Sequence, residues 1–205
     1  MKNFWNDRYG NQEYIYGKTP NVFFAEQLQT LKPGEILLPC EGEGRNAVFA
    51  ALKGWEVRAF DSSEAGKIKA GKLAAENKID IDYLIDEALT VQYPPNSFDV
   101  VAFIYAHFPP AIRKKIHQKA IAWLKPGGKI LLEVFNPKQL QNNSGGPKEL
   151  LMLYTEEMLR DDFEGLTIDL IETKTIELNE GKHHQGKADI IQFVATKKIE
   201  MSTKK

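Results

Sequence analysis

Short apolar runs alternate along the chain with longer segments of helical periodicity. The runs short enough to be strands are residues 35–39, 55–61, 80–85, 97–106 and 129–135. Helical spacing fills the intervals at residues 45–53, 62–77 and 109–125. Strands that alternate with helices are typical of βαβ units around a parallel sheet. The pattern therefore predicts an α/β fold with a doubly wound sheet.

The last third of the chain departs from this alternation. A loop rich in Asn, Gly and Pro is expected over residues 136–147, followed by a helix that ends near Asp162. Residues 167–178 and 188–197 then have the character of strands, joined by the turn sequence NEGKHHQG. We expect them to close the sheet as an antiparallel pair.

Composition and charge narrow the class of protein. A chain of 205 residues suits one domain, and we expect residues 1–199 to form it and residues 200–205 to be a disordered tail. The 27 basic and 28 acidic residues give a net charge of −1, which favours neither nucleic acid nor an anionic membrane as a partner. The N-terminus lacks a secretory signal, and no apolar run has the length of a membrane span. We expect a cytoplasmic monomer or homodimer that acts on a small molecule.

A glycine-rich turn, CEGEGRNA from Cys40 to Ala47, follows the first predicted strand. Gly42 and Gly44 let the backbone approach a ligand closely, and the first amides of the next helix favour a negative group. Asp61 ends the second strand, where a carboxylate accepts hydrogen bonds from both hydroxyls of a ribose. This order predicts a site for a nucleoside-bearing cofactor. A plain turn with a solvated acid, and the G-x-G-x-x-A fingerprint of an NAD-linked oxidoreductase, are the alternatives.

The ordered segments ILLPCEGEGRNA, FDSS, PPNSFDVV and LKPGGKILLE resemble the motifs of class I S-adenosylmethionine-dependent methyltransferases. The resemblance covers nearly the whole chain and implies a Rossmann-like sheet of seven strands, the last inserted antiparallel. The segments WNDRY, YIYGKTPN, GGPK and HHQGKA are similar to those of the bacterial small-molecule group related to tellurite, thiopurine and thiol methyltransferases. The resemblance implies S-adenosylmethionine as cofactor, S-adenosylhomocysteine as product, and a thiol or chalcogen anion as a candidate acceptor.

One part of the turn departs from the family pattern. Class I methyltransferases carry an acidic residue and a further glycine ahead of Gly42, where this chain has Leu38 and Cys40. We expect Glu41 to compensate, either by holding the ammonium group of the cofactor or by pairing with Arg45 to fix the turn. If Glu41 does neither, a nucleoside-binding protein without turnover is the alternative.

The resemblance places the other cofactor contacts residue by residue. The backbone from Cys40 to Gly44 would cradle the methionine moiety, and Asp61 would hold the ribose with Ser62 beside it. The remaining positions are Glu87 and Ala88 at the adenine, with Asp86 as an equal choice, and Ile104 and Tyr105 on the other side of the cofactor.

Methyl transfer from a sulfonium needs few catalytic side chains, because the protein mainly aligns the acceptor and excludes water. His107 follows the fourth strand, and its titration range suits a base; capping of the next helix is an equal alternative. The resemblance implies an N-terminal lid over residues 1–30, with Tyr16 and Gly17 closest to the cofactor and Thr19 as a helix cap. A hydrophobic strap over the core is the alternative. We predict His107 and Tyr16 as the catalytic residues.

The remaining histidines and the single cysteine have plainer interpretations. His117 lies among lysines in a helix, which predicts a solvated face. His183 and His184 are neighbours in an extended segment and point opposite ways, so a hairpin loop is favoured over the lining of a substrate mouth. One cysteine and four scattered histidines show no spacing of a metal site, and no metal is predicted.

Overall fold

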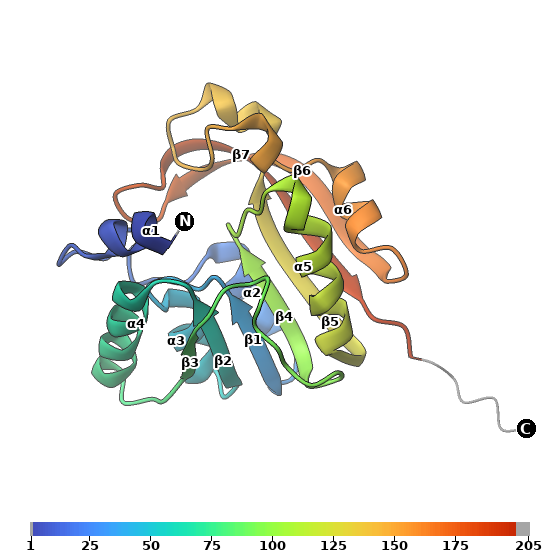
Figure 1. The fold of residues 1–205 in the computed structure, drawn as a ribbon, viewed down its shortest axis with the longest axis horizontal. Helices are drawn as coiled ribbons and strands as arrows, with labels where there is room; N and C mark the ends of the chain where they lie inside the picture. The colour runs from blue at the N-terminus through green and yellow to red at the C-terminus, as the bar shows by residue number, and fades with distance from the viewer. Residues whose placement is uncertain (1, 200–205) are drawn as a thin grey trace, which may run out of the picture.

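The computed structural model describes residues 2–199, so the expected tail at residues 200–205 lies outside the described residues. A seven-stranded sheet with the order β3-β2-β1-β4-β5-β7-β6 forms the centre (Figure 1). The strands are β1 Glu35–Pro39, β2 Glu56–Asp61, β3 Asp82–Ile85, β4 Phe98–Ile104, β5 Leu124–Phe135, β6 Thr167–Asn179 and β7 Gln185–Thr196. β1 to β5 are parallel, and β7 lies antiparallel between β5 and β6. The predicted doubly wound sheet of seven mostly parallel strands, with a terminal antiparallel hairpin, is confirmed.

Helices cover both faces of the sheet because the buried strands are apolar on both sides. On β1, Ile36 and Leu38 pack toward one set of helices, whereas Leu37 packs toward the other. Full burial of each such side chain contributes about 1.5–3 kcal/mol. The first face carries α2 Val22–Gln29, α3 Arg45–Leu52 and α4 Glu64–Glu76, and the second carries α5 Pro110–Trp123 and α6 Glu156–Asp162.

The carboxyl ends of the parallel strands meet at one edge of the sheet (Figure 1). Open α/β sheets bind their ligands at this edge. The connection from β5 to α6 also starts there, and it contains two short 3-10 helices, η1 Pro137–Gln141 and η2 Leu150–Met152. None of the helices between residues 2 and 199 has the length and apolar character needed to cross a membrane.

The N-terminal segment is more helical than the sequence predicted. Helix α1 covers Lys2–Tyr9 and packs against α4. Helix α2 is capped by Asn21, whose side chain accepts a hydrogen bond from the N–H of Phe24 at 2.9 Å. The expectation of Thr19 as the cap is therefore wrong, because Asn21 is the residue whose side chain reaches the free amide.

Two boundaries differ from the expected pattern. The predicted helix up to residue 125 ends at Trp123, and β5 already begins at Leu124, which pairs with Phe98. The Pro-Gly-Gly sequence at 126–128 lies within this strand, beside a register shift in the ladder with β4. In the expected loop at 136–147, the Asn136 side chain accepts from the N–H of Lys138 and starts η1.

The expectation that His117 faces solvent is wrong, because its side chain is completely buried. Nδ1 of His117 lies 2.8 Å from Asp162 in α6, and Arg113 donates to the same carboxylate at 2.6 Å. The lysines near His117 in the sequence lie on other faces of α5. Charged neighbours in the sequence therefore do not show that His117 itself faces solvent. The pKa of Asp162 is lowered by its hydrogen bonds to His117 and Arg113, which outweigh the effect of burial.

Asp162→Asn tests how far this buried charge cluster ties α6 to α5. We expect the free energy of unfolding to fall by about 3 kcal/mol, because Arg113 loses its buried counter-charge. Asp161→Asn is the matched control, since Asp161 is exposed and pairs with the exposed Lys114. Urea unfolding at pH 7 measures both variants, and an equal effect of the two substitutions would contradict the prediction.

Candidate functional site

The turn between β1 and α3 adopts backbone conformations that few residues tolerate. Gly42 and Gly44 have φ angles of +63° and +88°. A Cβ on Gly42 would lie 2.6 Å from the hydroxyl oxygen of Tyr9, and one on Gly44 would lie 2.5 Å from the Cβ of Ala70. Glycine is therefore required for α1 and α4 to pack against the turn. Cys40 also has a positive φ, +55°, in the left-handed region that glycine prefers.

The Glu41 side chain folds back onto the first turn of α3. Its Oε1 accepts hydrogen bonds from the N–H groups of Asn46 and Ala47, both at 2.8 Å. Arg45, one of the two partners considered from the sequence, forms its ion pair with Glu180 instead. Glu41 thus fixes the turn through backbone amides. Its carboxylate occupies the position that a helix N-terminus offers to an anion.

Burial sets the charge state of Glu41. It raises the pKa of this carboxyl to about 7, against the opposing effects of the amide of Ala47 and the charge of Arg45. Oε2 of Glu41 has only a long contact, 3.5 Å, to the Asn46 side chain. A cation bound beside Oε2 would favour the ionised form.

Asp61 ends β2 beside the same turn and is 6% exposed. Its Oδ2 accepts from the N–H of Gly42 at 3.1 Å, and its Oδ1 accepts from the N–H of Ser63 at 2.8 Å. Each oxygen keeps a lone pair for a further donor. Burial raises the pKa of Asp61, and the two amides oppose that shift. The arrangement fits a pair of ribose hydroxyls, with the partly buried Ser62 alongside.

Residues 10–21 form a segment that we call the N-terminal strap, and buried side chains of the turn hold it in place. Glu43 accepts from the N–H of Ile15 at 2.8 Å. Arg45 donates to the carbonyl of Tyr16 at 3.2 Å. Because both charged residues belong to the turn itself, a displacement of the strap would disturb the turn.

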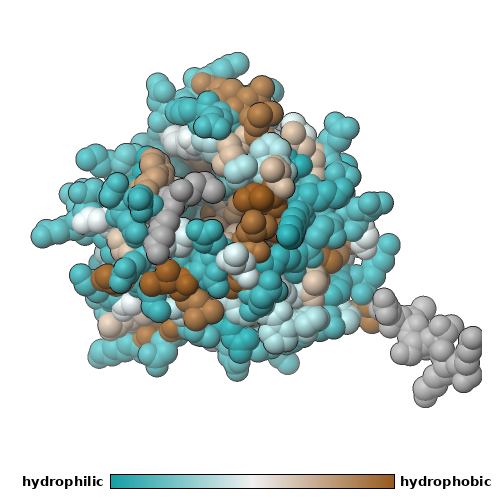
Figure 2. Space-filling model, in the orientation of Figure 1, coloured by the Kyte–Doolittle hydropathy of each residue, from teal (hydrophilic) through white to brown (hydrophobic). Residues whose placement is uncertain are grey.

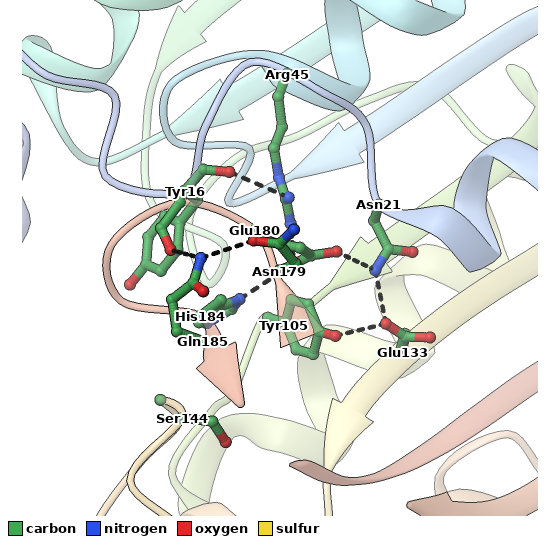
Figure 3. Close-up of polar contacts among 12 residues, drawn as sticks. Tyr16, Asn21, Arg45, Tyr105, Glu133, Ser144, Asn179, Glu180, His184 and Gln185 are labelled. Atoms are coloured by element: carbon green, nitrogen blue, oxygen red, sulfur yellow. Dashed lines mark hydrogen bonds and ion pairs between the residues drawn. The ribbon is translucent and has the colours of Figure 1, made fainter. Parts of the chain in front are cut away.

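A buried polar network joins the strap to the far side of the site (Figure 3). The amide Nδ2 of Asn21 donates to Glu133 at 2.6 Å and to Glu180 at 3.1 Å. Tyr105 donates its hydroxyl to Glu133 at 2.6 Å, and Arg45 pairs with Glu180 at 2.8 Å. Loss of Arg45 would leave the buried carboxylate of Glu180 without its counter-charge, which is strongly destabilising.

Tyr16 lies in the strap, with its ring 4.4 Å from the ring of His184. Its hydroxyl accepts a hydrogen bond from Arg8 at 3.1 Å. Burial raises the pKa of Tyr16, so the phenol stays protonated at neutral pH. The catalytic role of Tyr16 and the lid role of residues 1–30 stay predictions.

The other expected cofactor contacts follow the ends of β3 and β4. Ile104 is the last residue of β4, and Tyr105 follows it directly. Both side chains are partly buried. After β3, Ala88 is buried in the core, whereas Glu87 is exposed. The carboxylate of Asp86 accepts from the N–H of Glu87 at 2.7 Å, so the two acids considered for the adenine lie together.

Both ring nitrogens of His107 are engaged inside the protein. Nδ1 lies 2.7 Å from the carbonyl oxygen of Met152 and must carry the hydrogen, while Nε2 accepts from the N–H of Phe135 at 3.2 Å. Burial lowers the pKa of His107 to about 4. This geometry favours a structural role, in which His107 ties the end of β4 to β5 and η2, over the predicted role as base.

The sequence analysis missed Asn21, Glu133 and Glu180. Glu133 gave one signal, because it interrupts the apolar run KILLEVF and a charge in a buried strand requires partners. Those partners are Asn21, Tyr105 and Gln192, which stand 112, 28 and 59 residues away. No local pattern reveals contacts at such separations.

Apolar side chains gather on the connection between β5 and α6, which overhangs the carboxyl edge (Figure 2). Leu140, Leu150 and Leu151 are 40%, 57% and 66% exposed. No group of three or more His, Cys, Asp or Glu side chains within residues 2–199 has the geometry of a metal site.

Comparisons with known proteins agree with this architecture. A family model described as a methyltransferase domain matches residues 36–128, the segment that holds the turn, Asp61 and the end of β4. No curated protein matches the chain in sequence. These findings, together with the solved structures below, support a class I methyltransferase.

Three solved structures are similar to this chain. One, from a study of the conversion of a disulfide bond into a thioacetal group in echinomycin biosynthesis, has a TM-score of 0.80 at 16% identity, covering 99% of this chain and 94% of its own. TehB from Haemophilus influenzae has a TM-score of 0.71 at 14% identity, covering 96% and 67%. A methyltransferase from Methanosarcina mazei has a TM-score of 0.71 at 18% identity, covering 89% and 100%. The fold is the Rossmann-like fold of class I methyltransferases, as predicted.

Glu41→Gln tests the charge state of the turn, because Gln keeps an oxygen for the two amides of α3 and carries no charge. The folded pKa of Glu41, about 7, lies above the ordinary value of 4.5. The folded state therefore binds a proton more tightly than the unfolded state, and folding stability falls as pH rises from 4.5 to 7.

At pH 8 we expect the Gln variant to be the more stable protein by roughly 3 kcal/mol, and at pH 4 we expect no difference. Urea unfolding of both proteins across this range measures the effect. A stability difference that does not change with pH would contradict the assigned charge state.

Proposed function

We propose that this chain is an S-adenosylmethionine-dependent methyltransferase that acts on a small-molecule acceptor. The observation that carries the proposal is the position of Glu41, whose carboxylate takes the amides of Asn46 and Ala47 at the start of α3. The glycine turn therefore presents two acidic groups, Asp61 and Glu41, to whatever binds there, and a cation beside Glu41 would favour its ionised form. S-adenosylmethionine carries a sulfonium and an ammonium group and suits such a turn.

The same observation argues against an NAD-linked oxidoreductase. A dinucleotide places its pyrophosphate on the N-terminal amides of the helix that follows the glycine turn. Here Glu41 already fills that position, and a bound pyrophosphate would face its carboxylate. Like charges at this distance repel, so the turn disfavours the dinucleotide.

The residues assigned from the sequence keep their roles in this proposal. The backbone from Cys40 to Gly44 cradles the methionine moiety, and Asp61 accepts hydrogen bonds from the ribose with Ser62 beside it. The adenine is contacted by Ala88 and by Glu87, with its neighbour Asp86. Ile104 and Tyr105 contact the other side of the cofactor. The cofactor supplies an electrophilic methyl group, and the protein orients the acceptor and excludes water.

The acceptor site lies between the strap, the end of β5 and the overhanging connection. The exposed leucines of this connection favour a neutral or soft acceptor over a highly charged one. A thiol or chalcogen anion fits this description. A binding protein without turnover is the alternative of another class, and the formation of methylated product separates the two.

Calorimetry with S-adenosylhomocysteine, S-adenosylmethionine and NAD tests the proposal in the purified protein. We expect binding of the first two and none of NAD. Binding of NAD alone would overturn the proposal, and binding of none of the three would indicate a degenerate site.

Asp61→Asn tests the ribose contact in the same experiment. We expect the affinity for S-adenosylhomocysteine to fall by about 1–3 kcal/mol, because a charged acceptor is lost at a buried hydrogen bond. Asp99→Asn is the matched control. Asp99 lies near the start of β4, at the opposite edge of the sheet, where it pairs with Lys125. An unchanged affinity in the Asp61 variant would remove the ribose assignment.

A further inference from the structure

Histidines 107, 117 and 184 are enclosed by the fold, and their ring nitrogens differ in what they contact. In His107 both nitrogens are bonded to the backbone. In His117, Nδ1 contacts Asp162, and Nε2 is fully enclosed with no partner. In His184, Nδ1 contacts Glu180, and Nε2 has no hydrogen-bond partner among residues 2–199. Only His184 therefore combines an anchored ring with an available lone pair.

The carboxylate of Glu180 fixes the tautomer of His184. Nδ1 of His184 lies 3.2 Å from Glu180 Oε2. Because an ionised carboxylate only accepts hydrogen bonds, Nδ1 carries the hydrogen and Nε2 carries the lone pair. Glu180 is itself held by Arg45 at 2.8 Å and by Asn21 at 3.1 Å. This acid–imidazole pair has the hydrogen-bond order of an oriented general base.

Nε2 of His184 keeps a small accessible surface at the edge of the ring. His184 is only 4% exposed, yet its Nε2 is not among the fully enclosed side-chain atoms without a partner, which are Trp55 Nε1, Tyr93 Oη and His117 Nε2 in the described part of the chain. Gly145 lies across this edge with a φ of +118°. A Cβ at position 145 would lie 3.0 Å from Nε2 and 2.6 Å from Cδ2. Any residue with a side chain at position 145 would therefore press on this edge and cover Nε2.

His184 lies beside Glu180, Tyr16 and Tyr105 (Figure 3), on the side where the acceptor is proposed to bind. The hairpin between β6 and β7 carries it to the end of β5, because β7 is antiparallel to β5. Its ring lies 4.4 Å from the ring of Tyr16 and 4.6 Å from that of Tyr105, and 5.5 Å from that of Phe135. These aromatic rings limit the access of water to the imidazole.

We propose that His184 is the general base of this protein, oriented by Glu180, and that the acceptor is a thiol bound in its protonated form. This inference rests on the proposed methyltransferase function. Nε2 of His184 takes the thiol proton, the sulfur electron pair forms the new bond to the methyl carbon, and the bond from that carbon to the sulfonium breaks onto its sulfur. The imidazolium then lies against Glu180 and returns its proton to solvent.

Electrostatics around the ring agree with this role. Burial lowers the pKa of His184, and the hydrogen bond that Nδ1 donates to Glu180 opposes the shift, so the ring is neutral and able to accept a proton at pH 7. The charged and titratable groups that face it or its partner are Glu180, Arg45, Tyr16, Tyr105, His183 and His107. The charge of Arg45 disfavours a protonated His184, whereas the carboxylate of Glu180 stabilises it. Because these effects oppose each other, His184 holds the transferred proton only transiently.

The first test requires no turnover. Nitrogen NMR of the cofactor-free protein with ¹⁵N-labelled histidine identifies the His184 signals by their loss in His184→Gln. The exposed neighbour on the same turn provides the control, His183→Gln. We expect a neutral ring at pH 7 with hydrogen on Nδ1 and a lone pair on Nε2. Hydrogen on Nε2, or a doubly protonated ring at pH 7, would overturn the proposal.

The second test uses two thiols of similar size that each carry an aromatic ring and differ in the acidity of the S–H group. Benzyl mercaptan is protonated at pH 7, whereas 4-nitrothiophenol is already a thiolate. With the wild type we expect methylation of both. In His184→Gln we expect kcat for benzyl mercaptan to fall by about 100-fold, with little change for 4-nitrothiophenol and restoration by added imidazole. His183→Gln should retain wild-type rates with both thiols.

Equal losses with both thiols, or no loss with either, would overturn the role as base. Binding of S-adenosylhomocysteine to His184→Gln is measured alongside, so that a misfolded variant is recognised. If the wild type binds S-adenosylhomocysteine and methylates neither thiol, the thiol acceptor is wrong while the cofactor assignment stands. If it does not bind S-adenosylhomocysteine, the proposed function itself fails.

Discussion

The contact between the Glu41 carboxylate and the first amides of α3 is the interaction on which the candidate cofactor site depends. It satisfies two N–H groups that the helix leaves unpaired, and it places a carboxyl group with a pKa of about 7 where many nucleotide-binding folds receive a phosphate. Together with Asp61, it makes the turn selective for the charge of its ligand. The chain thus has its acid at Glu41, on the amides of α3, where the family pattern has one at the position of Leu38, and the proposed compensation stays a prediction.

The charges that follow in the turn connect it to distant parts of the chain. Glu43 and Arg45 hold the backbone of the N-terminal strap, and Arg45 continues to Glu180 in the β6–β7 hairpin. Asn21 then joins Glu180 to Glu133 in β5. The N-terminal strap and the β6–β7 hairpin therefore meet beside the glycine turn. The same network positions the turn, the strap and the acid that orients His184.

The sequence predicted the sheet well, because alternation of apolar runs and helices reports burial directly, and β1 was predicted with its observed bounds. It predicted the position of the glycine turn and of Asp61 at the end of β2, because glycine conformations and strand ends are local features. It did not predict the roles of Asn21, Glu133 and Glu180, whose partners are distant in sequence. It also ranked His107 above His184, because only the folded hairpin shows which histidine keeps a free nitrogen.

A crystal structure with bound S-adenosylhomocysteine tests the central claim most directly. The account predicts that Glu41 remains on the amides of Asn46 and Ala47, with the ribose hydroxyls on Asp61 and the homocysteine along residues 40–44. A ligand bound elsewhere, or a Glu41 side chain displaced from α3 by an anionic group of the ligand, would contradict it.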